Sequence, residues 1–240
     1  MSQTSFPFSG TEVIACLSGA LVLPTLGALV VADLHLEKGS RAAGRGRLLP
    51  PYDSRATLAA LSDAVARHAP RCVVCLGDSF DDRAGGSRLS DADAAQLRAL
   101  MAGREWVWIA GNHDPLPPAV GGDWVDELAI GPFALRHIAA SGPAAGEISG
   151  HYHPKAAVVV AGRRLSMRCF VSDGRRLILP AFGAYAGGLD VFSPAFAAVM
   201  TGDFTAWLLG RAQIHACPAR RLHGWPASGP PTTASPAARS

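Results

Sequence analysis

The 240-residue sequence lacks a large net charge, an even set of cysteines and any internal repeat. The formal net charge is only +3, which excludes a strongly basic protein that coats nucleic acid but permits a local basic patch. The five cysteines are odd in number and irregularly spaced. That pattern is atypical of a secreted disulfide framework and favours a reducing cytoplasm as the location.

A long uncharged run, residues 13–32, has no Lys or Arg before it. A signal peptide needs a positive segment at that point. Gly19, Pro24 and Gly27 also break the run into pieces too short to span a bilayer. We therefore predict two buried strands with a turn near Pro24. A membrane anchor is the less favoured alternative, which solubility without detergent would exclude.

The two ends of the chain have little to bury. Residues 1–10 are expected to form a flexible start. Residues 217–240 are rich in Pro, Ala, Ser and Thr, a composition typical of a disordered tail. No linker divides the stretch between them, so residues 11–216 are predicted to form one domain.

In the first half of this domain, apolar runs alternate with stretches of helical spacing. Strands are predicted over 28–32, 72–76 and 106–110, and helices over 53–68 and 90–101. This βαβ pattern places a site at the carboxyl ends of parallel strands. The second half has few helical candidates and is predicted to form a second sheet packed on the first. Its strands are expected over 133–136, 156–160, 164–170, 177–179, 197–200 and 205–209.

Five polar clusters follow the predicted strands in order. They are Asp33-Leu34-His35, Gly77-Asp78, Gly111-Asn112-His113-Asp114, a single His137, and Gly150-His151-Tyr152-His153. A D-x-H pair at a strand end should place both side chains on one face. Glycines beside the clusters would let the backbone turn sharply. Asp, Asn and His suit Mn, Fe or Zn, and two such ions can share the charge that develops when a hydroxide attacks phosphorus.

This series of motifs resembles the calcineurin-like metallophosphoesterase superfamily. The resemblance implies an α/β fold, a four-layer α/β/β/α sandwich of two mixed sheets flanked by helices. It also implies two divalent metal ions, with a bridging hydroxide as the nucleophile. The first metal would take Asp33, His35, Asp78 and His153, and the second would take Asp78, Asn112, His137 and His151. His113 would donate a proton to the leaving oxygen, and Asp114 would either orient His113 or cap the turn at Pro115.

Longer stretches resemble the PdeM family of ligase-associated DNA damage response endonucleases. They are Asp33-Leu34-His35-Leu36-Glu37-Lys38-Gly39, Leu49-Pro50-Pro51-Tyr52, Arg136-His137, Ile148-Ser149-Gly150-His151 and 179–185. The resemblance covers about residues 10–210 and implies a manganese-dependent enzyme that cuts single-stranded DNA in DNA repair. Other DNA repair proteins are the partners it suggests. One position departs from the family: Asp81 stands where a His is expected, and an ionised carboxylate cannot donate to a phosphate.

The residues expected to face the substrate are Arg41, Arg45, Arg47 and Asp81. The three arginines lie in a predicted loop after the first cluster, where a basic rim for phosphates and a merely solvated loop are equally compatible with the sequence. Lys38 is a similar case. The side chain of Arg136 should point away from the face that carries His137.

Other reactive or aromatic residues are better explained without a function. His68 and His215 are expected to face solvent. Cys72 and Cys75 form C-x-x-C, but residues three apart in a strand face opposite ways, so both are assigned to the core. Trp106 and Trp108 share a strand face, where packing against a helix is favoured over base stacking.

Three functions remain compatible with the motifs. The favoured one is hydrolysis of a phosphodiester in single-stranded DNA. A phosphoesterase for phosphomonoesters, cyclic nucleotides or dinucleotides would have the same metal ligands. A scaffold that kept the fold and lost catalysis is disfavoured, because every expected ligand type and His113 are present.

Overall fold

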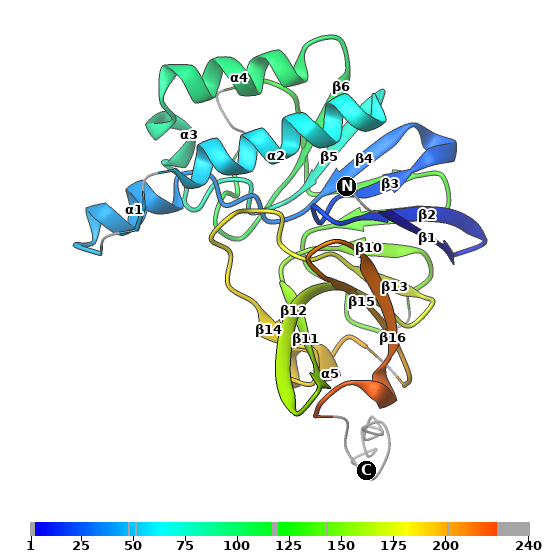
Figure 1. Ribbon diagram of the computed structural model, residues 1–240. Helices are drawn as coiled ribbons and strands as arrows, with labels where there is room; N and C mark the ends of the chain where they lie inside the picture. The colour runs from blue at the N-terminus through cyan, green and yellow to red at the C-terminus, as the bar shows by residue number, and fades with distance from the viewer. Residues whose placement is uncertain are drawn as a thin grey trace, which may run out of the picture.

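The computed structural model describes residues 3–47, 49–50, 52–116, 120–142, 144–200 and 202–224, and two sheets form its centre (Figure 1). In the first sheet, β1 to β4 pair antiparallel and β4 to β7 pair parallel. Its strands follow sequence order: Gln3–Phe8, Thr11–Cys16, Leu21–Leu23, Ala28–Val31, Cys72–Leu76, Glu105–Ile109 and Asp123–Val125.

Helices α1 (Lys38–Gly44) and α2 (Asp53–His68) connect β4 to β5, and α3 (Gly85–Arg88) and α4 (Asp91–Met101) connect β5 to β6. Figure 1 shows α2 and α4 side by side over the outer face of the first sheet, and α1 projecting from it. Ser90 caps α4, because its hydroxyl accepts a hydrogen bond from the Asp93 N–H. The two helices predicted from spacing are therefore confirmed.

The second sheet has the order β14-β11-β12-β13-β10-β9-β8, with β15 and β16 continuing from β12. Strands β9, β10 and β13 are parallel, and most other pairs are antiparallel. Its strands, from β8 to β16, are Glu127–Ile130, Phe133–Arg136, Glu147–Ser149, Pro154–Val160, Arg163–Ser172, Arg176–Ile178, Leu189–Asp190, Thr205–Leu209 and Ile214–Pro218.

Three apolar cores separate the layers. Phe8, Leu135 and Phe170 belong to the core between the two sheets. Leu58 and Leu61 of α2 pack in a second core against the first sheet. A third core covers the outer face of the second sheet around α5 (Pro194–Ala197), a helix of only four residues. The predicted sandwich is confirmed, with a thin outer layer on the second sheet.

Both ends of the domain extend beyond their expected limits. Residues 3–8 form β1 instead of a flexible start, because Phe6 and Phe8 alternate toward the core and Phe6 stacks on Trp207. At the other end, β16 runs to Pro218 and a 3-10 helix, η2, covers Ala219–Arg221. The expected tail therefore starts too early at 217, and residues 225–240 lie outside the described residues.

Three other expectations need correction. The segment 13–32 contains the end of β2 and the whole of β3 and β4, with a 3-10 helix, η1 (Pro24–Leu26), at the predicted turn. The stretch 197–200 is not a strand, because α5 starts at Pro194 and ends at Ala197, and a turn follows it. The stretch around Arg41 is α1 and not a loop. Within the described residues, no helix is long and apolar enough to cross a membrane.

Candidate metal centre

The polar clusters follow strands that lie next to one another. Asp33 follows β4, Asp78 follows β5 and Asn112 follows β6, and these strands are parallel neighbours. Their carboxyl ends therefore meet at one edge of the first sheet. His137 follows β9 and His151 follows β10 of the second sheet. Both sheets thus contribute to one centre.

Most of the expected ligand residues have backbone dihedral angles in the left-handed region. The φ angles are 54° at Asp33, 44° at His35, 45° at Asp78, 70° at His151 and 46° at His153. Such conformations cost about 1–3 kcal/mol each and persist only where the surroundings hold them. Here the Asp33 N–H donates to Gly77 O and the His35 N–H to Asp78 O. The D-x-H pair converges through these turns, and not through the strand alternation that the sequence argument assumed.

Asp33, His35 and His153 form the first group, with ligand atoms within 4.8 Å of one another. His153 Nε2 lies 3.3 Å from His35 Nε2 and 3.4 Å from Asp33 Oδ1. The Asp33 carboxylate is buried and accepts a hydrogen bond from the His151 N–H. On the far side of the His35 ring, Nδ1 lies 3.0 Å from Asp81 Oδ1, so Nε2 faces the group.

Asp78, His137 and His151 form the second group. His137 Nδ1 donates to Leu76 O at 2.8 Å. Its Nε2 lies 3.4 Å from Asp78 Oδ2, 3.2 Å from His151 Nδ1 and 3.0 Å from Asn112 Oδ1. Because Nδ1 holds the ring proton, Nε2 presents a lone pair. Several electron-pair donors therefore face one another at this point.

This convergence of donors fits bound cations. Burial disfavours a charge on His137, yet the Asp78 and Asp33 carboxylates outweigh it and raise the pKa of the imidazole. Burial would likewise raise the pKa of Asp78, but His137 and the His113 N–H lower it to about 2. A divalent metal can replace the shared proton, and the mixture of carboxylate, amide and imidazole suits Mn, Fe or Zn.

The packing of the groups explains the nearby glycines. Gly77 has a φ of +72°, and a Cβ there would lie 2.5 Å from the His137 ring. Gly111 and Gly150 do not have a positive φ, but a Cβ at either position would collide with Asp78 or Asp33. The expected sharp turn therefore occurs at Gly77, whereas the other two glycines allow close approach.

His113 is held beside the second group. Its Nδ1 lies 2.8 Å from Asp81 O, to which it donates, and its Nε2 lies 3.9 Å from Asp78 Oδ2. Arg41 donates to the same Asp81 carbonyl and, at 2.8 Å, to the Asp81 carboxylate. The ring of His113 is therefore oriented by a main-chain carbonyl, with Nε2 directed at the centre.

Asp114 makes a contact that the sequence argument did not foresee, while its two expected roles stay predictions. Its carboxylate accepts a hydrogen bond from the Phe80 N–H at 3.0 Å and so fixes the loop that follows Asp78. Burial raises the pKa of Asp114 to about 7, although the Phe80 hydrogen bond opposes this. This contact with Phe80, which lies in the loop after β5, could not be predicted from Asp114 and the residues next to it in the sequence.

The contacts of Asp81 with a metal-ligand histidine and with α1 were not foreseen from the sequence. It is buried and contacts His35, Arg41 and Lys38, the last at 3.5 Å. Burial raises its pKa, but His35 and Arg41 outweigh this and hold the pKa well below its usual range. Asp81 thus supports a ligand, and it also lines a hollow beside His113, so its expected place at the substrate stays a prediction. Its position three residues after Asp78 was the available signal.

The predicted arginines divide into two kinds. Arg41 lies in α1 and is tied to Asp81. Arg45 and Arg47 are exposed beyond the end of α1 and line neither of the two hollows described below. Arg136 pairs with Glu127 at 2.9 Å and lines a hollow together with His137.

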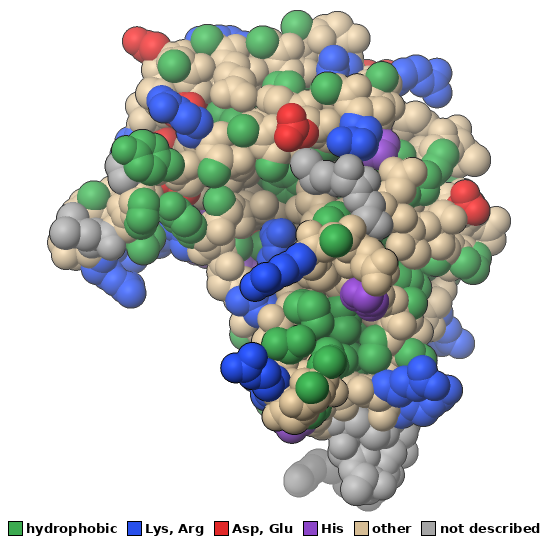
Figure 2. All heavy atoms as spheres, viewed as in Figure 1, with side chains coloured by type: hydrophobic (Ala, Val, Ile, Leu, Met, Phe, Trp, Pro, Cys, Tyr) green, Lys and Arg blue, Asp and Glu red, His purple; other side chains and the backbone are tan. Residues whose placement is uncertain are grey.

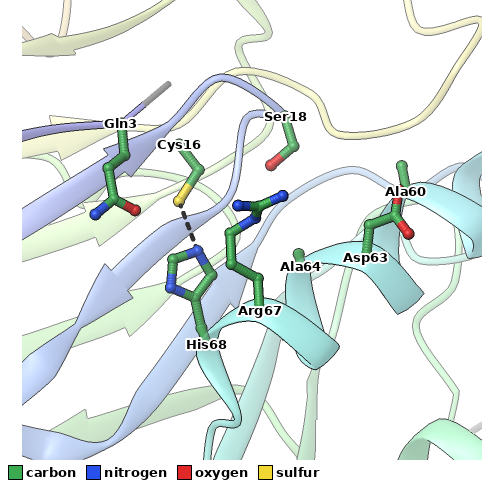
Figure 3. A pocket seen from close by; sticks show the side chains of 8 residues that line it. All are labelled: Gln3, Cys16, Ser18, Ala60, Asp63, Ala64, Arg67 and His68. Atoms are coloured by element: carbon green, nitrogen blue, oxygen red, sulfur yellow. Dashed lines mark hydrogen bonds between the residues drawn. The ribbon is translucent and has the colours of Figure 1, made fainter. Parts of the chain in front are cut away.

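The remaining reactive residues lie away from the centre. Cys72 and Cys75 belong to opposite cores, as predicted, and Trp106 and Trp108 are buried against the helices. His68 is only partly exposed and lies 3.4 Å from Cys16 Sγ (Figure 3). Burial raises the pKa of the Cys16 thiol to about 11, so it is no nucleophile at neutral pH.

The family model for calcineurin-like phosphoesterases matches residues 28–160. The chain belongs to this family. Among solved structures, Pseudomonas putida nuclease MPE has 29% sequence identity and a TM-score of 0.71, over 90% of this chain and 100% of that one. Yfce, a phosphoesterase from E. coli, has 14% identity and a TM-score of 0.38, over 79% of this chain and 97% of that one. No curated protein matches the chain.

Family membership gives the centre its chemistry. This calcineurin-like phosphoesterase is a metal-dependent enzyme that hydrolyses phosphoesters, and its buried His and Asp groups are placed to hold divalent metal ions. The sequence resemblance to the PdeM family is supported by the match to the nuclease. The assignment of each ligand to a particular metal, and the bridging role of Asp78, remain predictions.

Proposed function

We propose that this enzyme is a manganese-dependent phosphodiesterase that cuts single-stranded DNA internally. The match to a nuclease along the full length of that protein supports a nucleic-acid substrate. The PdeM resemblance supports manganese and a role in DNA repair alongside other repair proteins, and the five irregularly spaced cysteines support a cytoplasmic location.

The observation that carries this proposal is a pair of neighbouring open hollows beside the second group. One hollow of about 420 Å³ is lined by Arg41, Arg83 and His113, among others, and a second of about 350 Å³ by Arg136 and His137. Asn112 lines both hollows. A strand could therefore continue from one hollow into the other, as an internal phosphodiester requires.

The hollows carry both signs of charge, because Asp81 and Asp82 line the first and Asp126 and Glu127 line the second beside the arginines. In Figure 2 the surface is indented between α1 and the second sheet, with Lys and Arg side chains on both sides of the indentation. Arg41 and Arg88 are paired with Asp81 and Asp82. Arg83 is exposed beside His113 and is the cation we assign to a substrate phosphate.

When bound, two divalent ions would lower the pKa of water and neutralise the phosphoryl oxygens. The chain's own part is then to deliver a proton. In protonated His113, Nδ1–H is committed to Asp81 O, so Nε2–H is free to protonate the departing sugar oxygen. Asp81 acts indirectly, through the rings of His35 and His113.

The test is cleavage of a circular single-stranded DNA by metal-free protein, with and without added Mn²⁺. A circle has no ends, so any cutting is endonucleolytic. We expect cutting that depends on Mn²⁺ and is absent in Asp78→Ala. If the circle stays intact while a generic phosphodiester is hydrolysed, the metal centre stands and the substrate is a small nucleotide instead.

A further inference from the structure

The segment 183–189 is hydrogen-bonded at both ends to the main chain of residues of the first group. The Gly183 N–H donates to Asp33 O at 3.1 Å, and the Leu189 N–H donates to His153 O at 3.2 Å. A Cβ on Gly183 would overlap Leu34 O, so the close approach requires glycine there. The segment therefore lies directly against the metal centre.

Tyr185 is placed at the exposed turn of this segment. The Ala186 N–H donates to Gly183 O at 3.3 Å, which closes a turn around Ala184 and Tyr185. The Ala184 N–H also donates to Thr57 Oγ1 at 3.1 Å, which ties the turn to α2. Phe182, three residues earlier, is buried at 4% exposure, whereas Tyr185 is 37% exposed. The turn thus carries a partly exposed aromatic side chain two residues after Gly183, whose N–H is bonded to the main chain of Asp33.

The backbone that carries Tyr185 is close to the main chain of the first group. Tyr185 is two residues from Gly183, so their Cα atoms are at most about 7 Å apart. Gly183 is itself hydrogen-bonded to Asp33. A ring at this position can touch a nucleotide next to a phosphate bound at the centre.

We propose that Tyr185 is a stacking platform for a base adjacent to the scissile phosphate. This inference rests on the proposed cleavage of single-stranded DNA. Every base has a π-face, so stacking on a tyrosine is tolerant of sequence. Bases of a duplex are already stacked inside the helix, whereas those of a single strand are free to turn outward. Tyr185 thereby contributes to the preference for single strands.

The test separates the bases from the phosphates. With Mn²⁺-loaded enzyme, kcat and KM are measured on an oligothymidine and on an oligomer of equal length built from stable abasic nucleotides. Tyr185→Ala is expected to raise KM about tenfold for the oligothymidine, with less effect on kcat, and to leave KM for the abasic oligomer unchanged. Tyr185→Trp should retain the wild-type KM for both.

Leu165→Ala is the matched control, because Leu165 is 46% exposed on the far part of the β11–β12 hairpin. It should change neither KM. Tyr185→Leu, which keeps an apolar side chain, repeats the test if Tyr185→Ala unfolds. An unchanged KM for oligothymidine in both variants, with wild-type enzyme cutting DNA, overturns the stacking role alone. Wild-type enzyme that cuts neither oligomer overturns the proposed function with it.

Discussion

The two ligand groups differ in what stands behind their histidines. In the first group, His35 Nδ1 faces the carboxylate of Asp81 at 3.0 Å. In the second, His137 Nδ1 donates to the main-chain carbonyl of Leu76 at 2.8 Å. A carboxylate makes an imidazole a stronger electron-pair donor than a carbonyl does. The groups should therefore bind metal with different strengths.

The Asp81 carboxylate and the Leu76 carbonyl are also held in place in different ways. Leu76 is the last residue of β5, so the carbonyl behind His137 is fixed by the sheet itself. Asp81 lies in a loop and is held by Arg41 and Lys38 of α1. A network of side chains can be altered by single substitutions, whereas a sheet carbonyl cannot. The first group is thus the adjustable one.

The largest effect is expected when the second group itself is broken. Asp78→Ala should reduce hydrolysis of every phosphoester about 10³-fold or more, because the metal stabilisation worth several kcal/mol is lost. Steady-state rates on an aryl phosphodiester and on DNA measure this. Asp91→Ala, an exposed residue at the start of α4, is the control and should behave as wild type. A fully active Asp78→Ala would remove this residue from the centre.

The next effect concerns the proton donor beside the second group. His113→Ala should slow DNA cleavage about 10²- to 10⁴-fold. Hydrolysis of an ester with an acidic phenol should fall much less, because such a phenol leaves without protonation. Rates on the two substrates are compared for wild type and variant. Equal losses on both would argue against the general-acid role.

Asp81→Asn tests the difference between the groups most sharply. It should weaken the binding of one of the two ions about 10- to 100-fold and leave the binding of the other nearly unchanged. The reason is that the Asp81 carboxylate contacts His35, which belongs to the first group. Calorimetric titration with Mn²⁺ measures both sites. Asp91→Asn is the control, since Asp91 is exposed at the start of α4 and is in neither ligand group. Equal weakening of the binding of both ions would show that Asp81 does not act on the first group alone.

The smallest effect should come from the basic rim. Arg83→Ala should raise KM for DNA a few-fold and reduce the slope of log KM against log salt by about 1, as the loss of one phosphate contact predicts. Arg45→Ala should have a smaller effect, because Arg45 lies beyond the end of α1 and outside both hollows. A larger effect at Arg45 would reverse the assignment of the two arginines.

Much of the first half could be predicted from the sequence, because apolar runs and helical spacing are local signals. Strand β5 matches its expected bounds, and so does α2. The order of the ligand types was also visible, since each cluster directly follows a strand. These features depend on residues close together in the chain.

What could not be predicted depends on contacts between distant residues. Helix α1 contains Gly39 and Gly44, which are poor helix formers, but Asp53 accepts the Gly39 N–H and Asp81 binds Arg41. The left-handed turns at the ligands are likewise held by hydrogen bonds between loops. The strand β1 depends on Phe6 meeting Trp207 at the other end of the chain.

The most direct test of a two-metal centre is to titrate metal-free protein with Mn²⁺ and count the ions bound per chain. The account predicts two ions per chain in the wild-type protein and fewer in His137→Ala. This substitution removes the imidazole that contacts Asp78, Asn112 and His151. Binding of a single ion in fully active wild-type enzyme would contradict it.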